Sequence, residues 1–481
     1  MSASRTTLPF FLSATVLLSS LPGLFQSASA LEEVLGIEQQ DEFRRSRETD
    51  FGRMFPRLRP FQPNEALLAT LAEQMRDPAP GAAEGNNPDL KGAGFTFLGQ
   101  FLDHDLTLMV EPLGTADRNL FGLLNNRTAR LDLDSVYGGG LQGSPQLYDR
   151  RGRFLFSTPN GFEDFQRDPA TGVAVLVENR NDENLIIAQL HVAFQKFHNH
   201  YIDQGMRFKE AQQMVRWHWQ WIVVHEFLPT IVGQDVVDRF LTRDRFGRPK
   251  VKFEFFRVGN SNRPMMPVEF AVAAYRFGHS QVRNAYAMNE AGATAIFNAD
   301  GTDLRGSRPI PPELEIDFIN FFQIPGGPPP RNVFRKIDSL ISPNLFILPI
   351  GPVVASADTP VVQSLALRNL LRGARLGLPS YHDVATAMGI TPLSNEMLGL
   401  TDPAWGGKAP LWYGILKESE VLHNGARLGP TGGRIVAEVI LGLIDTDDDS
   451  YFNARRPWAP KDGSTPGTFF MHDLLRLAGA L

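Results

Sequence analysis

Two carboxylates and an imidazole stand side by side in residues 99–107, Gly-Gln-Phe-Leu-Asp-His-Asp-Leu-Thr. The apolar residues in and before this segment recur at the spacing of a helix: Phe97, Leu98, Phe101 and Leu102. This pattern predicts a buried or half-buried helix. On such a helix Gln100, Asp103 and His104 share one face, whereas Asp105 points roughly 100° beyond His104. One face would offer a carboxylate and an imidazole to a pocket, and the other a carboxylate to a cation. A helix end with solvated charges fits the same residues, so other segments must decide.

Oxygen donors occur on alternate residues of a second segment, Thr128–Ser135 (Thr-Ala-Arg-Leu-Asp-Leu-Asp-Ser). Such spacing lets one loop wrap a hard cation with side chains and a backbone carbonyl. Taken alone, the segment also fits a strand or turn with two exposed aspartates. Because Asp105 lacks an obvious partner, we expect this loop to bring the missing cation. The aspartates of residues 445–449 lack the glycine and glutamate of an EF-hand, and we predict a solvated loop there.

Arg180 and Glu183 stand three residues apart at the start of a predicted helix, so both side chains can face one pocket. A guanidinium group is permanently charged and rigid, which suits it to stabilise a developing anion. An ordinary surface ion pair has the same spacing, and the two residues do not decide between these interpretations.

His279 follows a glycine in the largely apolar segment Tyr275–His279 (Tyr-Arg-Phe-Gly-His). Glycine at this place would let a flat cofactor or another backbone approach closely. A histidine that binds iron needs its second ring nitrogen held by an acceptor, and Asn369 is a candidate for that acceptor. The other histidines are better explained by packing or give no usable signal.

The elements that must position these residues are mainly helical. Apolar periodicity predicts helices over residues 184–202, 211–227, 269–283 and 361–371, the second ending before Pro229. Residues 291–313 and 324–332 are predicted to be long loops, the latter rich in proline and glycine. Alternation with a period of two is scarce. We therefore expect a mainly α fold, built as one large unit with long loops and little β structure.

Composition limits the classes of function. The chain has 481 residues, of which 43% are hydrophobic, enough for a sizeable core. A net charge of -6 argues against a nucleic-acid partner, whose phosphates require a basic surface. The absence of cysteine excludes disulfides, thiolate metal sites and cysteine catalysis. Stability must then come from the core or from a bound cofactor or metal.

Residues 1–30 resemble a secretory signal, with Arg5 followed by an apolar stretch and the small-residue ending Ala28-Ser29-Ala30. An uncleaved membrane anchor is the alternative, but Pro9, Pro22 and the Ala-x-Ala ending favour cleavage. We expect an exported protein, secreted or periplasmic, that keeps no stable membrane anchor after cleavage. Residues 31–58 are predicted to form an N-terminal arm and residues 59–481 the catalytic domain.

Taken together, these motifs resemble those of the animal-type haem peroxidases of the peroxidase-cyclooxygenase superfamily, in particular its short bacterial members. The resemblance runs from Arg59 to the C-terminus, and its five motifs occur in the family's order: Gln100–Thr107, Thr128–Gly138, Arg180–Glu183, Tyr275–His279, and Asn369–Arg372 with Gly377–Tyr381. Residues 411–413 and 429–434 also resemble segments of the family.

The resemblance implies roles for the residues around a haem b group. His104 corresponds to the distal base, Arg180 to the distal arginine and Gln100 to a residue at the border of the peroxide and halide pocket. His279 corresponds to the iron ligand and Asn369 to its hydrogen-bond partner.

Two further sets of roles follow from the same resemblance. Asp103 and Glu183 match the carboxylates that form ester bonds to haem, and Arg276 and Arg372 match arginines that pair with its propionates. The residues that match the family's calcium ligands are Asp105, Thr128, Arg130 through its carbonyl, Asp132 and Asp134.

The implied activity is reduction of hydrogen peroxide with oxidation of bromide, iodide, thiocyanate or small phenols. Asn184 stands where the most oxidising members have a methionine bonded to haem, which argues against chloride chemistry. A fatty-acid dioxygenase of the same superfamily is one alternative, although the tyrosine segment of the cyclooxygenases has no counterpart here. A calcium-binding adhesion or scaffold protein without catalysis is the other.

Overall fold

The computed structural model of the chain describes residues 49–78, 85–109, 120, 123–260, 263–298, 300–349 and 362–481. All of them belong to one compact unit, Arg47–Leu481. The predicted signal segment and residues 31–48 of the predicted arm lie outside the described residues. Among the described residues, no helix combines the length and apolarity that crossing a bilayer requires.

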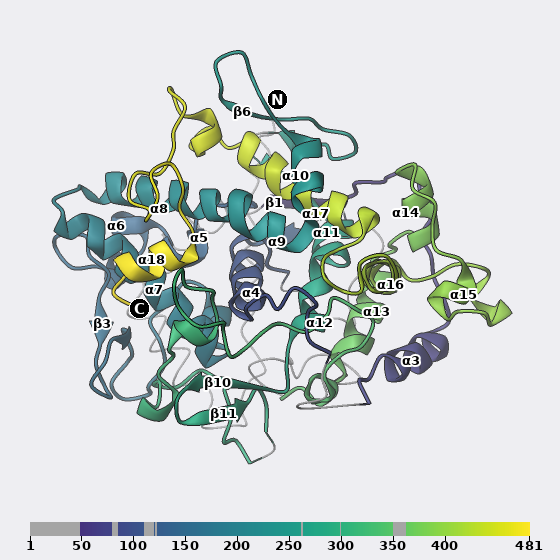
Figure 1. The fold of residues 1–481 in the computed structure, drawn as a ribbon, viewed down its shortest axis with the longest axis horizontal. Helices are drawn as coiled ribbons and strands as arrows, with labels where there is room; N and C mark the ends of the chain where they lie inside the picture. The colour runs from purple at the N-terminus through teal and green to yellow at the C-terminus, as the bar shows by residue number, and fades with distance from the viewer. Residues whose placement is uncertain are drawn as a thin grey trace, which may run out of the picture. The chain divides into compact units, whose positions relative to one another are not determined.

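Helix α4 (Gly94–Leu106) lies in the middle of this unit (Figure 1). Its neighbours are the helices α5 (Asp134–Tyr137), α7 (Leu185–Asp203) and α12 (Gly278–Gln281) and the 3-10 turn η3 (Asn179–Asp182). The predicted helix is confirmed, and its apolar side chains are almost completely buried. The helix stops where Thr107 becomes extended. Each neighbour carries residues that the sequence singled out.

Helix α7 begins at Leu185, and it is capped by Asn184, whose side-chain oxygen accepts from the Ile187 amide at 3.0 Å. Its predicted position is confirmed. It is buried around nearly its whole circumference rather than on one side, because it packs against α4, α8 (Phe208–Ile222) and α18 (Met471–Leu477).

The predicted end of the next helix before Pro229 is wrong. Helix α8 continues through a π turn, η4 (Val223–Phe227), into α9 (Leu228–Val232), and the run ends at Gly233 with φ 91°. Pro229 sits at the beginning of α9. A π turn relaxes the ordinary i to i−4 ladder, so the chain accommodates a residue that has no N–H and still remains helical.

The single helix predicted over residues 269–283 is also wrong. The segment consists of α11 (Val268–Ala271), the 3-10 turn η5 (Ala274–Phe277) and α12. Two carbonyls of this segment bond to side chains instead of to a helix ladder. The Arg276 Nε donates to the Ala271 oxygen at 3.1 Å, and the Trp412 Nε1 donates to the Arg276 oxygen at 3.1 Å. The break places His279 near the start of its own short helix.

The other helices surround this centre. They are α3 (Glu65–Gln74), α6 (Gly140–Gly143), α10 (Gln234–Phe240), α13 (Leu365–Arg375), α14 (Tyr381–Ala387), α15 (Asn395–Leu398), α16 (Leu411–His423) and α17 (Pro430–Asp445). Further 3-10 turns are η2 (Pro145–Leu147), η6 (Pro312–Leu314), η7 (Phe318–Asn320), η8 (Pro343–Phe346), η9 (Pro403–Trp405) and η10 (Tyr451–Asn453). Helix α13, predicted over residues 361–371, begins at Leu365 because the Ser364 side chain caps it.

The strands are short. In the largest sheet β1 (Thr49–Gly52) pairs antiparallel with β2 (Leu124–Asn125) and parallel with β9 (Met266–Pro267). The remaining strands form two-stranded ladders: β3 (Phe156–Ser157) with β4 (Asp164–Phe165), β5 (Leu241–Arg243) with β6 (Pro249–Val251), β7 (Gly259–Asn260) with β8 (Arg263–Pro264), and β10 (Ala285–Asn289) with β11 (Gly292–Ala295). Strand β11 lies in the predicted loop 291–313 and turn η6 begins at its end, so this segment is only partly irregular. The mainly α fold is confirmed.

Candidate active site

His104 projects from α4 with a defined arrangement of its ring nitrogens. Its Nδ1 lies 2.8 Å from the Asn181 Oδ1, an atom that only accepts. The proton of the neutral ring therefore resides on Nδ1, and Nε2 is left as an acceptor, 3.9 Å from the Glu183 Oε1. Burial, reinforced by the Arg180 charge, lowers the pKa of His104 to about 3. The ring is therefore neutral at physiological pH.

Asn181 was not recognised from the sequence. It is completely buried in η3, and its Nδ2 lies 3.0 Å from the Nδ1 of His191, which fixes the direction of the amide. The only signal in the sequence was its place directly after Arg180. His191, assigned to packing, is indeed buried, but it also orients the amide that holds His104.

Arg180 is held by Glu178, a carboxylate that no motif in the sequence singles out. Its Nε and Nη2 lie 2.9 Å from the two carboxylate oxygens of Glu178, and Nη2 also donates to the Thr107 oxygen at 2.7 Å. Its Nη1 is 3.9 Å from the Asp103 Oδ2. Although burial opposes ionisation, Arg180 and Arg127 hold the pKa of Glu178 far below its usual range.

Asp103 and Glu183 are partly accessible although they lie deep in the protein. Their side chains are 34% and 21% exposed, yet burial raises the pKa of both carboxyls, that of Glu183 to about 7. Gln100 donates from Nε2 to the Glu183 Oε1 and accepts from the Asn184 Nδ2 at 3.3 Å. Accessible surface on groups at this depth requires open space beside them, and we call this space the cavity.

His279 and Asn369 are brought together from α12 and α13. The Asn369 Nδ2 lies 2.7 Å from the His279 Nδ1, and the Asn369 Oδ1 accepts from the Arg276 Nη1 at 3.2 Å. The amide thus donates to the ring, the reverse of the acceptor role expected from the sequence, because Arg276 occupies its oxygen. Burial, with the Arg276 charge, lowers the pKa of His279 to about 3.

The His279 segment faces α4 directly. Tyr275 donates from its hydroxyl to the Gly99 oxygen at 3.2 Å, and Asp103 and Arg276 are close enough to influence each other's pKa. Arg372 reaches toward the same side, with its Nη1 3.3 Å from the Met109 sulfur. A Cβ added at Gly278 would meet nothing within 4 Å. A neutral histidine beside open space, with two arginines nearby, fits a flat anionic macrocycle such as haem.

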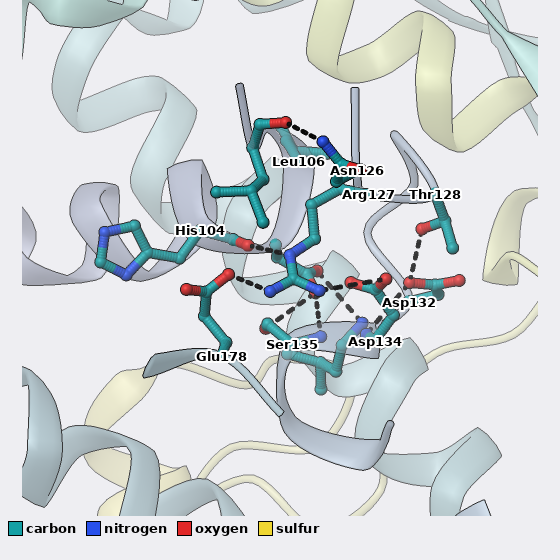
Figure 2. A network of polar contacts seen from close by, with 12 residues as sticks. His104, Leu106, Asn126, Arg127, Thr128, Asp132, Asp134, Ser135 and Glu178 are labelled. Carbon is teal, nitrogen blue, oxygen red and sulfur yellow. Dashed lines mark hydrogen bonds and ion pairs between the residues drawn. The ribbon is translucent and has the colours of Figure 1, made fainter. Parts of the chain in front are cut away.

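A carboxylate cluster forms on the opposite face of α4. One oxygen each of Asp105, Asp132 and Asp134 lies within 4.8 Å of the others, and Figure 2 shows Asp132 and Asp134 side by side. Burial and the two neighbouring carboxylates raise the pKa of Asp105 well above its usual value. The loop is turned by left-handed backbone at Ala129 and Leu133, with φ 50° and 58°. Three hard oxygen donors that repel one another fit a divalent cation.

Two other members of the predicted calcium loop have protein contacts. Thr128 donates from Oγ1 to the Asp132 Oδ1 at 3.0 Å. The Arg130 guanidinium lies 3.7 Å from the Asp447 Oδ1. The prediction of a solvated loop at residues 445–449 is therefore wrong for Asp447, which is 1% exposed. Its burial is possible because Arg216 also approaches it, at 4.0 Å.

Comparisons with known proteins indicate the family of the chain. A family model described as animal haem peroxidase matches residues 114–402. That span contains the carboxylate loop, Arg180, His279 and Asn369, whereas the His104 helix precedes it.

Curated relatives include two proteins named chorion peroxidase. The one from Aedes aegypti is 23% identical over 368 residues, covering 72% of this chain and 44% of the relative. The one from Drosophila melanogaster is 29% identical over 274 residues, covering 54% of this chain and 30% of the relative. The chain thus spans less than half the length of these curated relatives.

Solved structures share the fold. Peroxidase A from Dictyostelium discoideum has a TM-score of 0.62 at 16% identity, over 89% of this chain and 93% of that one. A fatty acid alpha-dioxygenase from Oryza sativa has a TM-score of 0.58 at 14% identity, over 92% of this chain and 87% of that one. At these identities the likeness establishes the architecture only. Because the family model matches more than half of the sequence, the chain belongs to the animal haem peroxidase family.

Proposed function

We propose that this chain is a haem-dependent peroxidase that reduces hydrogen peroxide and oxidises bromide, iodide, thiocyanate or small phenols. One observation carries the proposal: two neutral imidazoles, the buried His104 and the half-buried His279, project from elements that pack against each other, and Arg180 bonds to the His104 carbonyl. Peroxide chemistry needs an iron ligand on one side and a proton acceptor with a cation on the other.

His279 would hold the haem iron through Nε2, and Arg276 and Arg372 would pair with the propionates. When bound, haem supplies the electrons that cleave the O–O bond of peroxide. Because Nε2 must then be free of its proton, Nδ1 must carry one, and the Asn369 amide would turn its oxygen to the ring. Arg276, released from that oxygen, becomes available for a propionate.

His104 would move the proton of peroxide. Its bare Nε2 accepts the proton from one peroxide oxygen and returns it to the other, which leaves as water. The Arg180 Nη1 stabilises the negative charge that develops on the departing oxygen. Asn181 keeps Nδ1 protonated throughout, so the same nitrogen serves as base and then as acid. Gln100 would border the space where peroxide and halide enter.

Asp103 and Glu183 would join haem covalently through ester bonds to two of its methyl groups. Each ester replaces one methyl hydrogen, and one peroxide molecule is reduced to two waters as the bond forms. Their position in the cavity with accessible carboxyl groups supports this role. The cofactor would then be haem b linked at two points.

Asp105, Thr128, Asp132 and Asp134, with the carbonyl of Arg130, would bind Ca²⁺ on the other face of α4. Adjacent residues of one helix would thus bind haem, act on peroxide and bind calcium. Calcium would fix the helix that carries the base.

We further propose that residues 1–30 direct export and that residues 59–481, after the arm 31–58, form the catalytic domain of a secreted or periplasmic protein. Its partners are peroxide and small reductants rather than nucleic acid, consistent with its net charge of -6.

The proposal is tested by peroxide consumption after haem reconstitution, measured with each candidate reductant in turn. We expect consumption that requires a reductant and no oxygen uptake with fatty acids. Oxygen uptake with lipid and without peroxide would instead identify a dioxygenase. A protein that binds calcium but takes up no haem would indicate the scaffold alternative.

A further inference from the structure

Arg127 occupies the space between the carboxylate cluster and the His104 side of the cavity (Figure 2). It is 5% exposed and contacts three groups at once. Its Nη2 forms an ion pair with Glu178, its Nη1 lies 3.7 Å from the Asp134 Oδ2, and its Nε donates to the His104 carbonyl at 3.1 Å. One guanidinium therefore joins a candidate cation ligand to the backbone of the candidate base.

Glu178 extends this connection to Arg180. Its two carboxylate oxygens each lie 2.9 Å from a guanidinium nitrogen of Arg180, and Oε1 also accepts from the Arg180 backbone amide at 3.0 Å. Glu178 is 3% exposed. The charged side chain of Arg180 is thus oriented by a carboxylate that it shares with Arg127.

Asp134 and Glu178 compete for Arg127. Two buried carboxylates on one guanidinium attract it in different directions, and at low effective dielectric each attraction is strong. A divalent cation among Asp105, Asp132 and Asp134 would neutralise the charge of Asp134. Arg127 would then pair with Glu178 alone. If Asp134 kept its full charge, its attraction for Arg127 would oppose that of Glu178, and both the Glu178 carboxylate and the His104 carbonyl would lose part of their support.

We propose that the Arg127–Glu178 ion pair is a positioning unit that makes the reactivity at His104 and Arg180 depend on a cation bound by Asp105, Asp132 and Asp134. This inference rests on the proposed function. It adds a second connection between the cation and the peroxide side, which runs through the side chains of Arg127 and Glu178 rather than along α4. Neither Arg127 nor Glu178 touches the reacting atoms.

The first test needs no haem. The Arg180 amide bonds to the Glu178 carboxylate, so hydrogen exchange of a peptide spanning residues 178–183 reports the position of Glu178 directly. In the full chain, Ca²⁺ should slow this exchange about tenfold relative to a chelator, a coupling of ordinary size. Calcium binding itself is followed by terbium luminescence and metal analysis.

The second test uses the haem-loaded protein and cyanide, a probe that occupies the peroxide side of a haem and gives its proton to a base. Its dissociation constant should be about tenfold lower with Ca²⁺ than with chelator, and by linkage cyanide should tighten calcium binding equally. This readout is an equilibrium constant measured by absorbance, independent of turnover.

Arg127→Gln and Arg127→Lys should remove the calcium dependence in both tests. The lysine variant serves if the glutamine variant does not fold, because it keeps the buried positive charge. Its single ammonium group still cannot reach all three partners. Arg216→Gln is the matched control. Arg216 lies 3.3 Å from Asp132 of the same cluster, and its replacement also removes one positive charge. It should change calcium affinity and keep the dependence.

The proposal is overturned if Arg127→Lys retains the full calcium dependence, or if calcium binds the unaltered chain without changing exchange at residues 178–183. Failure to bind calcium also overturns it, and that result leaves the peroxidase assignment standing. Failure to bind haem would instead remove the peroxidase assignment, while the exchange experiment still decides the role of Arg127.

Discussion

Each of the two candidate catalytic histidines depends on which ring nitrogen carries the proton. Asn181 sets this for His104 by accepting from Nδ1, and Asn369 contacts Nδ1 of His279. Both rings are kept neutral by burial, so their nitrogens differ only through these amide partners. Single hydrogen bonds to amide side chains therefore determine which ring nitrogen carries the proton.

Replacing Asn181 should slow the reaction with peroxide without removing haem. In Asn181→Leu either nitrogen of His104 can hold the proton, and we expect a loss of about tenfold to a hundredfold in the second-order rate constant. Asn181→Asp keeps an acceptor at Nδ1 and should stay within about threefold by the same reasoning. Stopped-flow absorbance measures both variants. A leucine variant as fast as the unaltered protein, with an unchanged haem spectrum, would refute the role.

Removing both candidate ester residues should make the haem extractable. After reconstitution and peroxide treatment, acidified organic solvent should leave haem on the unaltered chain and remove it from Asp103→Val/Glu183→Gln. Mass spectrometry of the intact chains gives the retained mass directly. Equal extraction from both proteins would show that no ester bonds form.

The helical spacing of Gln100, Asp103 and His104 was sufficient to predict that they share a face, because neighbours on a helix follow from its 3.6-residue period. Asn181, Glu178 and Arg127 could not be found in this way. Asn181 meets His104 across 77 residues and Arg127 meets Glu178 across 51. These contacts form only when distant parts of the chain pack together, so no local sequence pattern predicts them.

At the scale of elements, η3 is the piece on which the His104 side of the cavity depends, since it carries Arg180 and Asn181. It is a short 3-10 turn with few bonds of its own and is held from outside. The Gly306 amide donates to the Glu183 oxygen at 2.9 Å, and Ser307 donates to the Asp182 oxygen at 2.6 Å. Arg167 bonds to the Asp182 carboxylate through Nη1 at 2.8 Å.

A methyl group at Gly306 should displace η3. An added Cβ would come within 2.0 Å of the Asp182 carbonyl oxygen, a backbone atom that cannot move alone. We expect Gly306→Ala to lower the free energy of unfolding by about 1–3 kcal/mol and to slow the peroxide reaction. Gly85→Ala is the control, because the added carbon there would meet only a lysine side chain at 3.6 Å. Denaturant unfolding and stopped-flow kinetics compare them, and equal stability of the two variants would contradict the packing argument.

The elements also show where sequence patterns fail. Residues 269–283 have the apolar periodicity of one helix, yet two of their carbonyls bond to side chains, one to Arg276 within the segment and one to Trp412 of α16, and the segment is divided. Pro229 signalled a helix end, yet a π turn carried the helix past it. In both places a contact or a backbone adjustment beyond the local pattern decided the structure.

At the scale of the whole molecule, the described residues form one mainly helical unit with a continuous apolar core, as composition and periodicity predicted. Its central pairings were beyond prediction, for example β1 beside β9, because such short strands carry no periodic signal. Without cysteine, stability depends on this core and on polar groups buried in it. Among the latter is His198, completely buried, with its Nδ1 3.1 Å from the Tyr137 hydroxyl and its Nε2 3.0 Å from the Gly152 oxygen.

Buried neutral histidines should make the protein sensitive to acid. Burial lowers the pKa of His198 to about 4 and that of His218 to about 4, whereas an unfolded histidine titrates near pH ~6.5. As the pH falls from about 6.5 to about 4, the unfolded chain binds protons that the folded chain excludes, so stability falls by about 1.4 kcal/mol per pH unit and residue. Below the folded-state pKa of about 4, both states bind the proton, and the lost unfolding free energy is not regained.

His198→Gln keeps a donor and an acceptor but does not titrate. The unfolding free energy of this variant, measured between pH 6.5 and pH 4, should fall less steeply than that of the unaltered chain. Parallel curves would show that His198 is not responsible.

The proposed binding of haem by His279, opposite His104, is tested by the absorbance spectrum of the purified full chain after haem reconstitution. We expect the intense Soret band of histidine-bound haem in the unaltered chain and in the control His200→Ala. In His279→Ala we expect the features of histidine ligation to be lost from this band. A chain that takes up no haem, or a His279→Ala variant whose spectrum and peroxide reaction match those of the unaltered chain, would contradict it.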